Sequence, residues 1–287
     1  MLIGIWVDGL VQSCIYTTMA FGMVLVFSIL GILNWAHGQF YMLGAMVLWS
    51  VVMLAGFPFG VGLLFSALLI GVLGMLVEKF IIDRVNVPSA SGALYVTAVT
   101  IALQLFFVGG ASMLWGRLEK GLGMVMPGIL SLGGVNISHQ KIAVIIFTLV
   151  VMAVMYFVLG HTRTGLAIRA AAQRPDAAML YGVHVGRIKT LVMGIGCAMA
   201  ALAGCFMAPI YPVSPFMGGI PMIMSLLAIV IGGIGSLTGA IVGGVILGLL
   251  NSVIAYYLSY FSEVVLFALV ILILLIRPQG LFGVPVK

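Results

Sequence analysis

Residues 161–191 read HTRTGLAIRAAAQRPDAAMLYGVHVGRIKTL and differ from the rest of the chain in their charge. This segment holds five of the twelve lysines and arginines: Arg163, Arg169, Arg174, Arg187 and Lys189. On either side lie apolar runs, 142–159 and 190–211, and a helix needs about 20 such residues to cross a bilayer core. We therefore predict that residues 161–189 form a loop in water between two membrane spans.

The composition of the chain excludes a soluble protein. Hydrophobic residues make up 64% of the sequence and charged residues 6%, whereas soluble domains average about 45–50% and about 25%. We therefore predict an all-α polytopic membrane protein, a single transmembrane domain over residues 1–287 that lies in a lipid bilayer. The net charge of +6 comes from short loops, so we read it as an orientation signal and not as a nucleic-acid site.

The cysteines give no sign of a disulfide framework, a metal site or a cofactor. Cys14, Cys197 and Cys205 all lie inside apolar runs, without CxxC spacing. Buried, unreactive thiols are the expected outcome.

The uncharged runs predict helices near 10–33, 38–55, 60–77, 93–115, 142–159 and 190–208, followed by a charge-free stretch at 222–262 and a run at 264–276. With the 161–189 loop in the cytoplasm, alternation places the N-terminus outside and Arg277 and Lys287 inside. Nine of the twelve cations then lie inside, as the positive-inside rule requires. The 222–262 stretch is either one long broken span or two short ones, which gives about eight or nine transmembrane helices.

Glycines in the 222–262 stretch allow two readings. Gly235, Gly239 and Gly243 repeat every four residues, as do Gly244 and Gly248, and such a face lets a neighbouring helix approach closely. Alternatively, three glycines loosen the helix at membrane depth and the freed backbone lines a cavity: Gly232, Gly233 and Gly235. The four prolines between 209 and 221 predict an irregular outer loop before it.

A second polar segment, GILNWAHGQF at 31–40, follows the first span. Asn34, His37 and Gln39 are costly in contact with lipid, so they are expected to face the bundle interior. They either satisfy a helix break or contribute to a transport pathway.

Within the 161–189 loop, RPDAAMLYG has the pattern of a short helix. Pro175 suits the first helical position, Asp176 the first turn and Gly182 the end. On charge alone, a merely connecting helix is an equal alternative.

These motifs together resemble a known family. The spacing of Asp176, Ala177, Ala178 and Gly182 is similar to the EAA loop of ABC importer permeases, with Asp in place of Glu. LGILNWAHGQFYMLGA, TRTGLAIRAAAQRPDAAMLYGV, MAPIYPVSPFMGG, IVIGGIGSLTGAIVGG and RPQGLFG occur in this order. The chain thereby resembles the LivH type permease subunit of branched-chain amino acid ABC importers over nearly its full length.

The resemblance implies half of a translocation pore, with a larger-bundle fold like that of the cobalamin importer, in a bacterial cytoplasmic (inner) membrane. Its implied partners are a LivM type permease, two ATP-binding subunits and a periplasmic or extracellular substrate-binding protein. The segment Pro175 to Tyr181 would be the coupling helix that docks on an ATPase, closed by Gly182. The residues of the preceding loop that match are Arg163, Thr164, Gly165 and Arg169.

The residues themselves agree with a permease that is not an enzyme. No GxxxxGK[ST] phosphate-binding loop is present in the sequence, so energy has to come from other subunits. Sparse charge in the spans suits a zwitterionic, partly apolar solute such as a branched-chain or other hydrophobic amino acid. The alternatives are the same architecture carrying urea, short amides or aromatic acids, and an ion-coupled secondary transporter.

Overall fold

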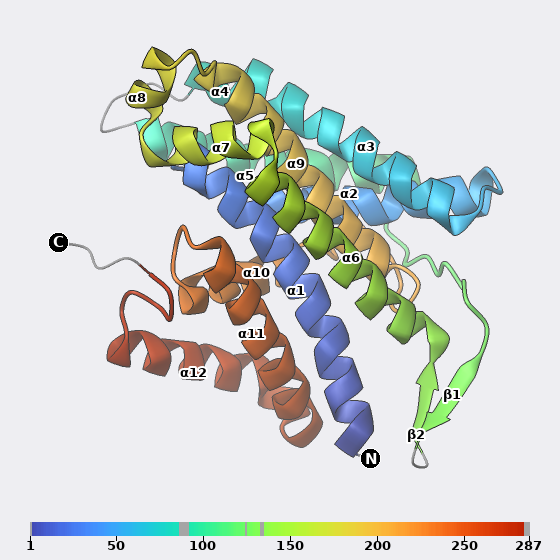
Figure 1. Cartoon of the computed structure of the whole chain (residues 1–287). Helices are drawn as coiled ribbons and strands as arrows, with labels where there is room; N and C mark the ends of the chain where they lie inside the picture. The colour runs from blue at the N-terminus through green and yellow to red at the C-terminus, as the bar shows by residue number, and fades with distance from the viewer. Residues whose placement is uncertain (1, 86–91, 124, 133–134, 284–287) are drawn as a thin grey trace.

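A computed structural model gives the fold of residues 2–85, 92–123, 125–132 and 135–283. Twelve α-helices occupy this part of the chain (Figure 1): α1 (Leu2–Leu30), α2 (His37–Trp49), α3 (Phe59–Val77), α4 (Asp83–Val85), α5 (Gly92–Trp115), α6 (His139–His161), α7 (Arg163–Gln173), α8 (Pro175–Leu180), α9 (Val185–Met207), α10 (Gly219–Gly232), α11 (Leu237–Tyr257) and α12 (Ser262–Ile276). Two π-helical turns, Ser50–Leu54 and Glu78–Ile82, extend α2 and α3, and a 3₁₀ turn, Ser259–Phe261, precedes α12.

The predicted all-α membrane fold is confirmed. Within the described ranges, eight helical segments are long and apolar enough to cross a membrane, and α10 is a shorter apolar helix of 14 residues. The 222–262 stretch contains α11, which is long enough to span a membrane, and most of the shorter α10, with a break between them. Most predicted bounds are close, but α1 begins at Leu2 and ends at Leu30 instead of covering 10–33. Lys287 lies outside the described residues.

The only sheet in the described ranges is a hairpin that the sequence analysis did not anticipate. Strand β1 (Ile129–Leu132) pairs antiparallel with β2 (Val135–Ser138), and Ile129 lies opposite Ser138. Figure 1 shows this hairpin and the N-terminus at one end of the bundle, with α7, α8 and α4 at the opposite end. These are called the hairpin end and the loop end below.

Helix α1 lies at the centre of the bundle and packs against α9, α10, α11 and α6. Its contact with α11 is close because Gly244 and Gly248 lie directly against the backbone of Thr17 and Ser13. Ser13 Oγ also donates to the Val245 carbonyl oxygen at 3.0 Å, and Ser252 Oγ of α11 donates to the Ile5 carbonyl oxygen at 2.7 Å. The glycine face predicted for α11 is thus a helix-packing surface.

One residue of that predicted face lies elsewhere. Gly239 and Gly243 pack against Gly232 and Ala228 of α10, but Gly235 precedes α11, which begins at Leu237. The prediction that Gly235 shares a helix face with Gly239 and Gly243 was therefore wrong. The backbone leaves the helical conformation at Gly233 and Gly235, with φ of +105° and +86°.

Helices α2 and α10 both begin inside the bundle. Tyr41, in the second turn of α2, lines the same cavity as Tyr16, which lies in the middle of α1. At the other helix, Gly218 directly precedes α10 and touches Gly38 of α2. The proline-rich loop ends there, and Pro221, predicted to be irregular, lies in the first turn of α10, where its missing N–H costs no hydrogen bond.

Candidate functional site

The 161–189 loop forms two short helices at the loop end. Thr162 caps α7, since its Oγ1 accepts a hydrogen bond from the Gly165 N–H at 3.0 Å. A Cβ atom at Gly165 would collide with the carbonyl oxygens of Val158 and Leu159. Glycine at this position therefore lets α7 sit directly against the end of α6.

The short helix predicted at RPDAAMLYG is present as α8. Pro175 occupies its first turn with Asp176, and Gly182 follows it with φ of +83°. The chain turns back here because the Val183 N–H donates to the Ala178 carbonyl oxygen at 3.1 Å. Ala178 is buried in a small apolar cluster with Ala171 of α7 and Val185 of α9, so α8 is fixed to both neighbours.

The end of α8 presents apolar side chains to the surroundings. Met179, Leu180 and Tyr181 are 53%, 88% and 89% exposed. Arg163, Thr164 and Asp176 are exposed as well, whereas Gly165 and Ala178 are buried and Ala177 is half-buried. The predicted residues of this loop therefore divide into a buried set that fixes the two helices and an exposed set that is free to contact another protein.

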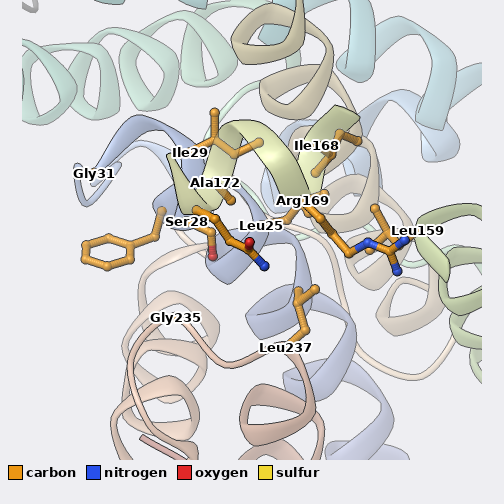
Figure 2. A pocket seen from close by; sticks show the side chains of 12 residues that line it. Leu25, Ser28, Ile29, Gly31, Leu159, Ile168, Arg169, Ala172, Gly235 and Leu237 are labelled. Carbon is orange, nitrogen blue, oxygen red and sulfur yellow. The ribbon is translucent and has the colours of Figure 1, made fainter. Parts of the chain in front are cut away.

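Arg169 of α7 lines a cavity that the predicted helix break also borders. It donates from Nη2 to the Gly160 carbonyl oxygen at 3.3 Å and lines a cavity of about 510 Å³ whose other walls include Ser28 and Gly31 near the end of α1, and Gly235. Figure 2 shows Arg169, Ile168 and Ala172 from α7 above Gly235 and Leu237, with Leu25 and Ser28 of α1 beside them. Arg169 and Gly235, which are 66 positions apart in sequence, thus line the same cavity at the loop end.

The break at Gly232, Gly233 and Gly235 is where α10 ends and α11 begins. Ser236 caps α11, because its Oγ accepts from the Gly239 N–H at 3.0 Å. At the end of α10, the Leu281 and Phe282 N–H groups donate to the carbonyl oxygens of Ile231 and Gly232 at 2.8 and 2.9 Å. The backbone of the break is paired with the C-terminal segment on one side, and Gly235 borders the cavity on the other.

Asn34, His37 and Gln39 form a separate buried group. Their exposed fractions are 2%, 0% and 3%, which confirms that they face the interior. Asn34 Oδ1 accepts from the Ala36 N–H at 3.0 Å, and the Asn34 carbonyl oxygen accepts from the His37 N–H at 3.1 Å. Within the described residues, both ring nitrogens of His37 and Oε1 of Gln39 have no hydrogen-bond partner. Asn34 therefore shapes the turn before α2.

The sequence analysis missed a polar cluster near the hairpin end. Asn251 Nδ2 of α11 donates to Gln12 Oε1 at 2.6 Å and to the Tyr16 hydroxyl oxygen at 3.1 Å, and all three residues line a cavity of about 240 Å³. Asn251 and Gln12 are amide side chains inside otherwise apolar spans. That contrast with their neighbours is the signal that would have located the cluster.

The chain is similar in sequence to known proteins over nearly its whole length. The family described as branched-chain amino acid transport system / permease component matches residues 5–274. The chain belongs to this family. The permease is similar to the LivH permease protein of the high-affinity branched-chain amino acid transport system of Escherichia coli K12, with 31% identity over 97% of this chain and 94% of that protein.

Two further relatives cover the same span. BraD, a high-affinity branched-chain amino acid transport permease of Pseudomonas aeruginosa, is 30% identical over 97% of the permease and 95% of its own length. A probable LivH protein of Methanocaldococcus jannaschii is 26% identical over 97% of the permease and 92% of its own length. No solved structure matches the permease.

Proposed function

We propose that this permease is one half of the translocation pathway of an ABC importer for branched-chain amino acids. The observation that carries the coupling role is α8, a helix held by buried Ala178 that exposes Leu180 and Tyr181 almost completely. Large apolar side chains at the end of a fixed helix suit a groove on another protein. Coupling would pass through α7 and α8 as the sequence implied: Arg163, Thr164, Gly165, Arg169, Pro175, Asp176, Ala177, Ala178 and Gly182.

In this proposal the whole chain acts as a single permease domain, residues 1–287. It pairs with a LivM type permease, while two ATP-binding subunits dock at the loop end and a substrate-binding protein delivers the amino acid at the hairpin end. The membrane is the bacterial cytoplasmic (inner) membrane, with the loop end in the cytoplasm. The assignment of substrate rests on the LivH and BraD relatives. It is supported by spans with very few charges, which favour a solute that carries no net charge.

Helix α1 gives the coupling helices a mechanical connection to the pathway. Helix α7 packs against α1, and α1 in turn packs against α10 and α11, so a displacement of α7 by the ATPase would reach the α10–α11 break through α1. Helix breaks of this kind line substrate paths in transporters.

The double variant Leu180→Ser/Tyr181→Ser tests the coupling. Neither side chain packs within the chain, so thermal stability and pairing with the second permease should be unchanged, whereas stimulation of ATP hydrolysis by the loaded binding protein and uptake of leucine in proteoliposomes should be lost. Phe80→Ser is the matched control, since Phe80 is 54% exposed and lies between α3 and α4, outside α7 and α8. Normal uptake by an assembled double variant would refute the docking role of α8.

A further inference from the structure

The cavity lined by Gln12, Tyr16 and Asn251 has an apolar floor. Met207, Met217 and Ile220 contribute to it, and no Asp, Glu, Lys or Arg is among its lining residues. Its hydrogen-bonded side chains, Gln12, Tyr16 and Asn251, lie on the α1–α11 side, and Tyr41 and Tyr211 also line it. A cavity with one polar wall and several apolar ones suits a small ligand that has an apolar side chain and a polar head.

A second cavity, of about 280 Å³, adjoins the first. Gln12, Ile15 and Tyr211 line both, so the two cavities lie side by side, and together they are called the hollow below. The second part differs in that it is also lined by Asp8 of α1 and Lys141 of α6. Among the lining residues, charge is thus confined to the cavity nearer the N-terminus, whereas apolar side chains line both.

Asp8 and Lys141 form an ion pair of 2.5 Å, and it is the only ion pair within the described ranges. Their side chains are 48% and 32% exposed, and ion pairs with this much access to water contribute little to stability. Little stability is therefore lost when Asp8 or Lys141 leaves the other and pairs with a charged group of a ligand. The pair places one negative and one positive group side by side at the rim of the apolar cavity.

We propose that this hollow is the entry site for the zwitterion of the amino acid. Asp8 accepts hydrogen bonds from the α-ammonium group, Lys141 donates to the α-carboxylate, and the aliphatic side chain lies against Met207, Met217 and Ile220. The inference rests on the proposed function for its substrate class, and it adds the residues that hold the head group.

Photolabelling tests the site in the assembled importer. Proteoliposomes that contain both permeases, the ATP-binding subunits and the binding protein loaded with a diazirine analogue of leucine are irradiated, and labelled peptides are identified by mass spectrometry. Label is expected on peptides that contain Met207, Met217 or Ile220. Asp8→Asn and Lys141→Met should each lower it by roughly tenfold, as expected when a hydrogen bond to a charged group is lost. Asp83→Asn and Arg84→Met, which change exposed charges of α4 at the opposite end of the bundle (Figure 1), are the matched controls and should label normally.

Two more variants separate ligand binding from a simple tie between α1 and α6. Ile220→Trp fills the cavity at a side chain that is 56% exposed, so it should block labelling without unfolding the protein. The exchange Asp8→Lys/Lys141→Asp restores the ion pair but inverts the positions of the ammonium and carboxylate partners, and an L-amino acid bound that way would direct its side chain out of the cavity. Labelling restored by this exchange would overturn the proposal.

Label outside these peptides, in a wild-type importer that takes up leucine, would also overturn it. A wild-type importer that hydrolyses ATP but takes up no leucine would contradict the proposed function first, and the entry site for that substrate with it.

Discussion

Gly38 and Gly218 touch at the point where α2 and α10 begin, and a Cβ atom on either would collide with the carbonyl oxygen of the other. The two helices run from this junction toward opposite ends of the bundle. Neither residue has a positive φ, so glycine is required here by space and not by backbone conformation.

Gly38→Val or Gly218→Val should therefore separate the two helix starts. We expect each to destabilise the protein by about 1–3 kcal/mol, the usual cost of overpacking a core, visible as a lower melting temperature of the purified complex. Gly60→Val is the control, because nothing lies within 4 Å of a Cβ at Gly60 in the first turn of α3. Equal melting temperatures for Gly38→Val and Gly60→Val would show that the junction tolerates a side chain.

His37 is expected to serve transport more than folding. Its ring is fully buried without a hydrogen bond among the described residues, so His37→Leu removes no bond and should leave thermal stability unchanged or slightly higher. Uptake per assembled complex should nevertheless fall several-fold, because the polar ring stands beside the α2–α10 junction. Thr148→Val provides the comparison, since Thr148 is a buried polar residue of α6 whose hydroxyl group likewise has no hydrogen-bond partner in the described part of the chain. If assembly of the complex fell as much as uptake, His37 would serve folding and not the transport pathway.

Glu78 depends on Thr190 for its hydrogen bond. Glu78 is 1% exposed, and its Oε2 accepts from Thr190 Oγ1 at 2.5 Å, which ties the end of α3 to the start of α9. Thr190→Val should cost about 1–3 kcal/mol, because it leaves a buried carboxyl group with one partner fewer. Thr97→Val is the control, since Thr97 bonds only within its own helix, to the Ala93 carbonyl oxygen. Unchanged thermal stability of Thr190→Val would mean that water replaces the hydroxyl group.

The orientation of the bundle predicts which positions react with an impermeant thiol reagent. Asp176→Cys, at the loop end, should label only from the cytoplasm, and Arg117→Cys, after α5, only from outside. Both are made in a background in which the three native cysteines are alanine: Cys14, Cys197 and Cys205. Labelling of both positions from the same side would overturn the proposed topology.

Local signals in the sequence predicted the elements of the loop end correctly. Pro175 and Gly182 located α8, and Gly233 and Gly235 located the break after α10, because proline and glycine act through the backbone of their own residue. The contact between Gly38 and Gly218 left no comparable signal, since glycines that allow close approach look the same as glycines that allow a turn. The entry hollow was missed for a related reason. Gln12 and Asn251 are far apart in sequence, and they come together only when α1 packs against α11.

The hydrogen bonds that end α10 also bear on how the protein is made. The carbonyl oxygens of Ile231 and Gly232 are paired with Leu281 and Phe282, which the ribosome adds only after α11 and α12. Until those residues are added, the two carbonyl groups need water or another partner for their hydrogen bonds. The end of α10 therefore reaches its final hydrogen bonding only after translation has passed the last helix.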